Sequence, residues 1–195
     1  MPHPNPIEQH PFKPFLPANA KVLLLGSFPP QSKRWSMAFY YPNLQNDFWR
    51  ICGLLFFHDK NTFIIEDKKR FDLDRIIAFC TDKGIALYDT ATAIRRLKEN
   101  ASDKFLEVVT PTDIPAMMQQ IPNCQTLVTT GQKATETLCS ILDCEQPSLN
   151  QYTPISIGAK TYNFYRMPST SRAYHLSLEK KADAYKAMFR NSGLL

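Results

Sequence analysis

The amino-acid sequence predicts a three-layer α/β/α sandwich around a central parallel sheet of about four strands. Short apolar runs recur along the chain, at residues 21–25, 85–88, 125–130 and 161–167. Amphipathic segments of helical period separate these runs, an alternation typical of parallel sheets with helices on both faces. Two of the runs break into tight turns of small residues and prolines, as strands do where they reach the ligand-binding edge of an open α/β sheet.

The first twenty residues are predicted to form an extended N-terminal arm rather than a helix or a central strand, because they are rich in proline. The prolines are Pro2, Pro4, Pro6, Pro11, Pro14 and Pro17. Phe12, Phe15 and Leu16 are available to pack the arm against the rest of the protein. Residues 21–195 are long enough for one sizeable core and are predicted to form a single domain.

Helices are predicted between the strands from apolar residues at helical spacing. Residues 46–57 begin with an Asx residue, which is a preferred N-cap, and residues 73–83 are followed by Gly84, which is a preferred C′ residue. Further helices are expected at 112–120, 131–142 and 177–190. Residues 90–104 are predicted to be loop or irregular helix, and residues 147–153 a simple connection.

Composition indicates a globular protein, with 44% hydrophobic and 21% charged residues. The formal net charge of +5 and an isoelectric point near 8.9 are compatible with a phosphate-bearing partner. No apolar run approaches the roughly 20 residues of a membrane span, and residues 1–6 do not resemble a signal peptide, so a cytoplasmic enzyme is expected.

Cysteine and histidine spacing predicts neither a disulfide framework nor a metal site, and no cofactor is expected. The five cysteines contain no C-x-x-C pair and are interpreted as buried thiols: Cys52, Cys80, Cys124, Cys139 and Cys144. The four histidines form no ligand pattern.

Candidate functional residues follow the predicted strands. In the turn Gly26-Ser27-Phe28-Pro29-Pro30, Gly26 permits close backbone approach and the prolines fix the loop; the alternative is a rigid turn without a ligand. Asp89 follows the second strand, where its carboxylate could take a proton from water or stabilise a sugar cation. It could equally cap a turn or pair with Arg95 or Arg96.

Five segments in order resemble the uracil-DNA glycosylase superfamily, specifically its mismatch-specific uracil (thymine) branch and its hypoxanthine-DNA glycosylase branch. The segments are residues 22–30, 39–49, 127–134, 167–171 and 177–181, and the resemblance covers residues 21–189. The resemblance implies a base pocket that includes Gly26, Ser27, Phe28, Pro29 and Tyr41, with Tyr41 stacking on an extruded base. It also implies that Asn46 is catalytic, although Asn46 is equally well placed to be a helix N-cap.

The sequence departs from this family at two functional positions. Phe28 stands where the mismatch-specific branch has an asparagine that positions water, and Met167 stands where a histidine or asparagine is usual. An apolar ring cannot orient water, so neither mechanism is carried over. Asn46 and Asp89 are then the catalytic candidates.

DNA contacts are expected from residues 167–172, which resemble a second motif of this family, and from the predicted helix start at residues 131–133. The candidates are Lys133, Ser169, Thr170, Ser171, Arg172 and Tyr174. The expected function is that of a monomeric, monofunctional DNA glycosylase that flips out uracil or hypoxanthine and leaves an abasic site. The alternatives are a catalytically weak DNA-damage-binding protein and a Rossmann-type nucleotide enzyme, the latter disfavoured because the first turn lacks G-x-G-x-x-G.

Overall fold

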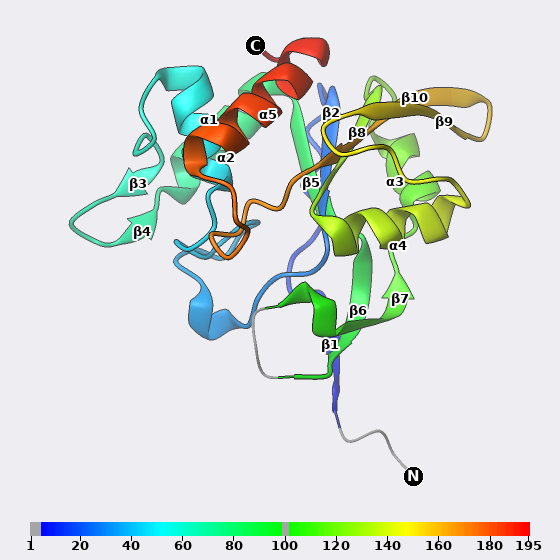
Figure 1. The fold of residues 1–195 in the computed structure, drawn as a ribbon, viewed down its shortest axis with the longest axis horizontal. Helices are drawn as coiled ribbons and strands as arrows, with labels where there is room; N and C mark the ends of the chain where they lie inside the picture. The colour runs from blue at the N-terminus through cyan, green and yellow to red at the C-terminus, as the bar shows by residue number, and fades with distance from the viewer. Residues whose placement is uncertain (1–4, 99–101) are drawn as a thin grey trace.

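The computed structural model describes residues 5–98 and 102–195 and has a central sheet between two layers of helices (Figure 1). The strands of this sheet are β2 (Val22–Gly26), β5 (Ile85–Asp89), β8 (Thr126–Thr130), β9 (Tyr152–Ile157) and β10 (Lys160–Met167). The helices are α1 (Phe48–Phe57), α2 (Leu73–Lys83), α3 (Ile114–Gln120), α4 (Gln132–Leu142) and α5 (Leu178–Asn191). In Figure 1, α1, α2 and α5 lie on one side of the sheet and α3 and α4 on the other, which confirms the predicted three-layer class.

The order of the central sheet is β5-β2-β8-β10-β9. Within the described residues β5, β2, β8 and β10 run parallel, as predicted, and β9 adds an antiparallel edge. The predicted connection at 147–153 therefore runs into a strand that the sequence did not reveal. The strand β9 is mostly exposed and contains Pro154, features that weaken a strand signal and that only an edge position tolerates.

A second, antiparallel sheet has the order β1-β6-β7 and consists of β1 (Ile7–Gln9), β6 (Ala91–Arg96) and β7 (Leu106–Pro111). The prediction of loop or irregular helix for residues 90–104 is thus wrong over β6, while residues 99–101 lie outside the described residues. A 3₁₀ turn η2 (Asp103–Phe105) precedes β7. The strand β6 pairs with β7, the next strand along the chain, and with the distant β1, a partner of which its local composition carries no signal.

The N-terminal arm packs along the domain as predicted. Phe12, Phe15 and Leu16 are partly buried against the main core. Phe15 exchanges two backbone hydrogen bonds with Leu87, at 3.0 and 2.9 Å. The arm therefore pairs with the outer edge of β5 before the chain enters β2.

The remaining elements are a 3₁₀ turn and a two-stranded hairpin: η1 (Ser32–Arg34), β3 (Ile64–Ile65) and β4 (Arg70–Phe71). The helix α2 has the predicted limits, and Gly84 ends it at φ +73° against the carbonyl of Asn19. In the described part of the chain, no helix combines the length and apolar content needed to cross a membrane.

Candidate active site at the carboxyl edge of the sheet

The strand order creates a crevice between β2 and β8. The chain leaves β2 toward β5 on one side and leaves β8 toward β10 on the other, so the connections diverge above these neighbouring strands. Such a switch point is where open α/β sheets bind ligands. Gly26, Asp89, Thr130 and Met167 all end strands at this edge.

Gly26 and Asp89 are paired across β2 and β5 and touch closely. A Cβ atom at Gly26 would collide with Asp89 Oδ1 and would lie 3.8 Å from the Tyr41 hydroxyl oxygen. Glycine is therefore required at this position by close approach, and it brings Tyr41 and Asp89 to the same point.

Tyr41 spans the crevice from the loop before α1. Its hydroxyl is 2.9 Å from Thr130 Oγ1, and its ring stacks on Phe48 with the centroids 4.3 Å apart. Burial, and to a smaller extent the charge of Asp89, raise the pKa of Tyr41, so its phenol stays neutral. Phe39 and Tyr40 are buried in the core, whereas Tyr41 keeps part of its surface exposed.

Asp89 is buried and paired with the N-terminal arm. Its Oδ2 lies 2.8 Å from His10 Nε2, while Oδ1 accepts no hydrogen bond from any described residue. The sequence-based alternative of a pair with Arg95 or Arg96 is wrong, since these side chains pair with Glu107 and Glu8. The Oδ1 atom is thus available to a ligand beside Gly26.

Ser27 points to a second carboxylate, that of Asp103 on η2. Its hydroxyl donates to Asp103 Oδ2 at 2.6 Å. Much of Asp103 is exposed, but its carboxylate faces this buried serine, and burial raises its pKa with a smaller contribution from Asp89. The hydrogen bond from Ser27 and the charges of Arg96 and Lys133 act in the opposite direction.

Phe28 and Pro29 turn toward the smaller sheet. The Phe28 ring is only 7% exposed and packs in a second apolar cluster with Ala91, Ile94 and Leu106. Pro29 is buried, and its carbonyl accepts from the Arg96 guanidinium at 2.6 Å. Phe28 therefore has a packing role in the structure.

Asn46 lies on the loop before α1, beside the loop that follows β10. Its Oδ1 accepts from the backbone N–H of Phe48 at 2.9 Å, an Asx turn that leads into α1, but the N-cap of the helix is Asp47 and not Asn46. Its Nδ2 donates to no described residue, which leaves that donor free. Asn46 also forms an isolated bridge with Ser171, and this brings the two loops together.

A buried ion pair joins these loops to α5. Asp47 accepts from Arg172 Nε through Oδ1 and from Lys181 Nζ through Oδ2, both at 3.0 Å. Lys181 is completely buried and also donates to the Ser171 carbonyl at 2.8 Å. The loop after β10 is thereby held in one position.

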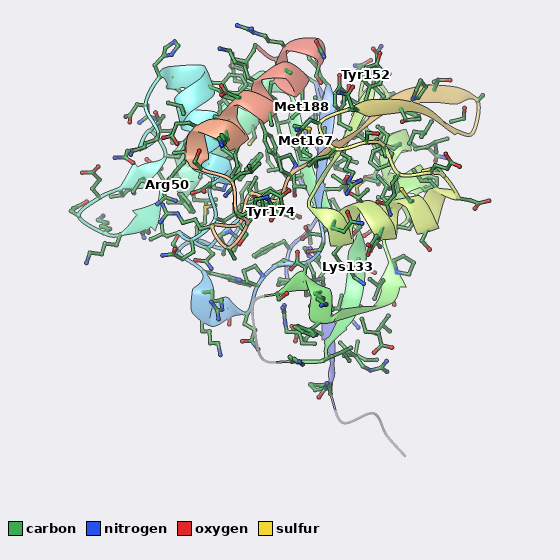
Figure 2. All side chains as sticks on the ribbon, viewed as in Figure 1. Arg50, Lys133, Tyr152, Met167, Tyr174 and Met188 are labelled. Atoms are coloured by element: carbon green, nitrogen blue, oxygen red, sulfur yellow. The ribbon has the colours of Figure 1, made fainter. Side chains whose placement is uncertain are left out.

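The predicted DNA-contacting residues differ in exposure. Arg172 is 44% exposed, whereas Thr170 is only 2% exposed and is the least available hydroxyl. Ser169, Ser171 and Lys133 are partly exposed. Figure 2 shows Tyr174 on the loop that leads into α5 and Lys133 at the first turn of α4, while Met167 is sealed in the core.

A hollow of about 600 Å³ lies beside the Asp47 ion pair. Its lining includes Arg50, Lys60, Arg172 and Lys181, with Asp47 and Glu179 as the acidic groups. Arg50 is already held by the carbonyls of Leu44 and Asn46. This hollow therefore presents a basic surface next to the loop after β10.

Sequence reasoning missed the roles of three side chains of this site. For Lys181 a signal existed, because it shares the helical stripe of Ala182, Tyr185 and Met188 and so falls on the buried face of α5. For His10 and Asp103 none existed, since both reach the site through long-range contacts.

The cysteines behave as interpreted. Cys52, Cys80, Cys124 and Cys139 are buried and Cys144 is partly buried, all as free thiols. Burial raises the pKa of Cys124 to about 11 and that of Cys139 to about 12. Over residues 5–98 and 102–195, no group of three His, Cys, Asp or Glu side chains is placed to hold a metal ion.

The fold is similar to that of a solved structure. The solution NMR structure described as "a putative Uracil DNA glycosylase from Methanosarcina acetivorans" superposes with a TM-score of 0.64 at 22% sequence identity. The match covers 96% of this chain and 99% of that chain, and at this identity it shows the fold. No protein-family model matches the chain, and no curated protein does.

Proposed function

We propose that this protein is a DNA glycosylase that flips a deaminated base out of the duplex and hydrolyses its N-glycosidic bond. The observation that carries the proposal is the meeting of Gly26, Tyr41, Asp89 and Thr130 at the switch point of the sheet. An aromatic ring can stack on an extruded base, and a carboxylate with one free oxygen can assist cleavage of a glycosidic bond.

Asp89 is the proposed group facing the sugar. Its free Oδ1 accepts a proton from water as the water oxygen bonds to C1′ and the C1′–N bond breaks, with the electron pair leaving on the base. The same negative charge stabilises the sugar cation that develops as the base departs. Tyr41 restores stacking to the extruded base, worth about 1–3 kcal/mol.

Asn46 is the proposed contact to the base. Since its Oδ1 is engaged by the Phe48 N–H, the free Nδ2 is the atom that can donate to a base carbonyl, as in uracil or hypoxanthine. In this role Asn46 contacts the base and does not position the attacking water. The activation of water then falls to Asp89.

DNA binding is proposed for the loop after β10 and the start of α4. Arg172 and Lys133 supply cations, and Ser169, Ser171 and Tyr174 supply hydrogen bonds to phosphates beside the extruded nucleotide. The Asp47 ion pair keeps this loop rigid, which reduces the ordering that binding requires.

A base-release assay tests the proposal. The purified protein is incubated with duplexes carrying uracil, hypoxanthine, xanthine or mismatched thymine, and abasic sites are revealed by alkaline cleavage. We expect alkali-dependent strand breaks with at least one base and no borohydride-trapped complex, since Lys181 is sealed against Asp47. Damage-specific binding without release from any duplex would favour a binding protein, for which the apolar Phe28 and Met167 are the supporting observation.

A further inference from the structure

The N-terminal arm contributes a histidine to the candidate site. The His10 side chain is 2% exposed and its Nε2 lies 2.8 Å from Asp89 Oδ2, although 79 residues separate the two. A carboxylate only accepts hydrogen bonds when ionised, so Nε2 carries the proton in this contact. This is the one hydrogen bond to the Asp89 carboxylate from the described residues.

The second nitrogen of the ring faces both backbone groups of Phe12. Nδ1 is 3.1 Å from the Phe12 nitrogen and 2.9 Å from the Phe12 carbonyl oxygen. With the proton on Nε2, Nδ1 can accept from the Phe12 N–H. Both ring nitrogens are therefore engaged, which fixes the orientation of the ring.

Aromatic side chains surround the pair. The His10 ring lies 4.5 Å from Tyr88, 5.2 Å from Phe28, 6.0 Å from Phe12 and 6.2 Å from Tyr40, measured between centroids. Burial, followed by the charge of Asp89, raises the pKa of both tyrosines, so they are neutral. Two further charges lie near the pair: the Arg96 guanidinium is 5.8 Å from the Phe28 ring, and the charge of Asp89 raises the pKa of Asp103 after the larger effect of burial.

The arm is fixed on both sides of His10. Before it, β1 pairs with β6 and Glu8 accepts from Arg96 at 3.0 Å; after it, Phe15 pairs with Leu87. The His10 backbone N–H itself donates to the Thr92 carbonyl at 2.8 Å. The imidazole is thus held in place by a folded segment and not by a loose tail.

We infer that His10 is a positioning residue, which holds Asp89 Oδ2 so that Oδ1 faces the reacting sugar. The inference rests on the proposed function, because it needs Asp89 to act on a substrate. A charge-assisted hydrogen bond here replaces the water that burial removes from the carboxylate. Through this hydrogen bond the N-terminal arm becomes part of the active site.

The first test compares two substitutions of His10 in single-turnover excision. His10→Phe fills the aromatic pocket but lacks the donor, whereas His10→Gln places an N–H near the position of Nε2. We expect His10→Phe to lower the excision rate by roughly 10- to 100-fold with the DNA Kd unchanged, and His10→Gln to recover most of that loss. Equal rates for His10→Phe and wild type, or an equal loss in both variants, would overturn the inference.

A double-mutant cycle separates positioning from simple packing. In an Asp89→Asn background, His10→Phe should cause no further loss, because His10 acts only through Asp89. Additive losses would contradict the inference. Lys13→Ala changes an exposed side chain of the same arm and is the control, which should keep the wild-type rate.

The pairing is also measurable without activity, by NMR of protein with ¹⁵N-labelled histidine. We expect a slowly exchanging proton on His10 Nε2, lost in Asp89→Ala, and a rapidly exchanging proton in the wild type would overturn the pairing. A wild type that releases no base overturns the proposed function, and with it the positioning role. An active wild type with a neutral His10→Phe overturns the positioning role alone.

Discussion

Lys181 Nζ lies 3.0 Å from Asp47 Oδ2, and both side chains are buried where α5, the start of α1 and the loop after β10 meet. Asp47 is also paired with Arg172, so one carboxylate anchors two cations from the proposed DNA-contacting loop and its supporting helix. The position of this loop therefore depends on a buried pair of opposite charges.

Replacing Lys181 should lower the stability of the protein. Lys181→Met leaves the buried Asp47 with only the half-exposed Arg172, and loss of one partner of a buried pair costs about 3–5 kcal/mol. We expect that decrease in the free energy of unfolding, measured by urea denaturation. Lys180→Met is the control, since Lys180 is exposed and should change stability by less than about 0.5 kcal/mol. A change as small in Lys181→Met would mean that the pair does not hold the loop.

The proposed DNA face predicts a change in salt dependence. Removing a cation that binds one phosphate should lower the slope of log Kd against log salt by about one. We expect this for Arg172→Ala and for Lys133→Ala. Lys160 begins β10 at the opposite edge of the sheet, so Lys160→Ala should keep the wild-type slope. Equal slopes in all four proteins would place the DNA elsewhere.

Two substitutions of Asn46 separate its role in the turn before α1 from its proposed contact with the base. Asn46→Asp keeps an acceptor for the Phe48 N–H but removes the Nδ2 donor, whereas Asn46→Ala loses both and should cost about 1 kcal/mol of stability. We expect both variants to lower single-turnover excision by roughly 10² or more. Wild-type excision by Asn46→Asp would show that Asn46 has a structural role alone.

Phe28→Asn tests whether the apolar residue in the first turn is structural. The ring is buried among Ala91, Ile94 and Leu106, so the substitution removes packing and buries an amide. A loss of about 3 kcal/mol or more in the free energy of unfolding is expected, with no gain in uracil excision. Phe28→Leu keeps most of the volume and should lose less. Faster excision by Phe28→Asn would indicate that position 28 does face the reacting water.

Much of the fold could be predicted because β2 and β5 are buried on both faces and read as mainly apolar runs, while β8 is rich in β-branched residues. The end of α2 could also be predicted locally, because a glycine after a helical segment is a common helix stop. In the structure Gly84 has a φ of +73°, which favours glycine. The strand β6 escaped because one of its partners is the distant β1, and β9 escaped because it is mostly exposed and contains Pro154. The sequence of β6 does not show that residues 7–9 will pair with it.

Only the site residues that lie at the ends of strands could be predicted from the sequence. Gly26 and Asp89 were found because each closes an apolar run, and the structure brings them into contact. The alternative of a pair between Asp89 and Arg95 or Arg96 was wrong because it relied on proximity along the chain. His10 lies in a proline-rich segment without periodicity, and only the three-dimensional path of the arm brings it to the sheet.

The most direct test of the central claim is the release of free base from damaged duplexes, quantified by mass spectrometry for wild type and Asp89→Asn under single-turnover conditions. The two proteins should bind DNA equally, and the wild type should release uracil or hypoxanthine at least roughly 10² times faster. Equal rates of release would contradict the role of Asp89, and the absence of any released base from the wild type would contradict the glycosylase function itself.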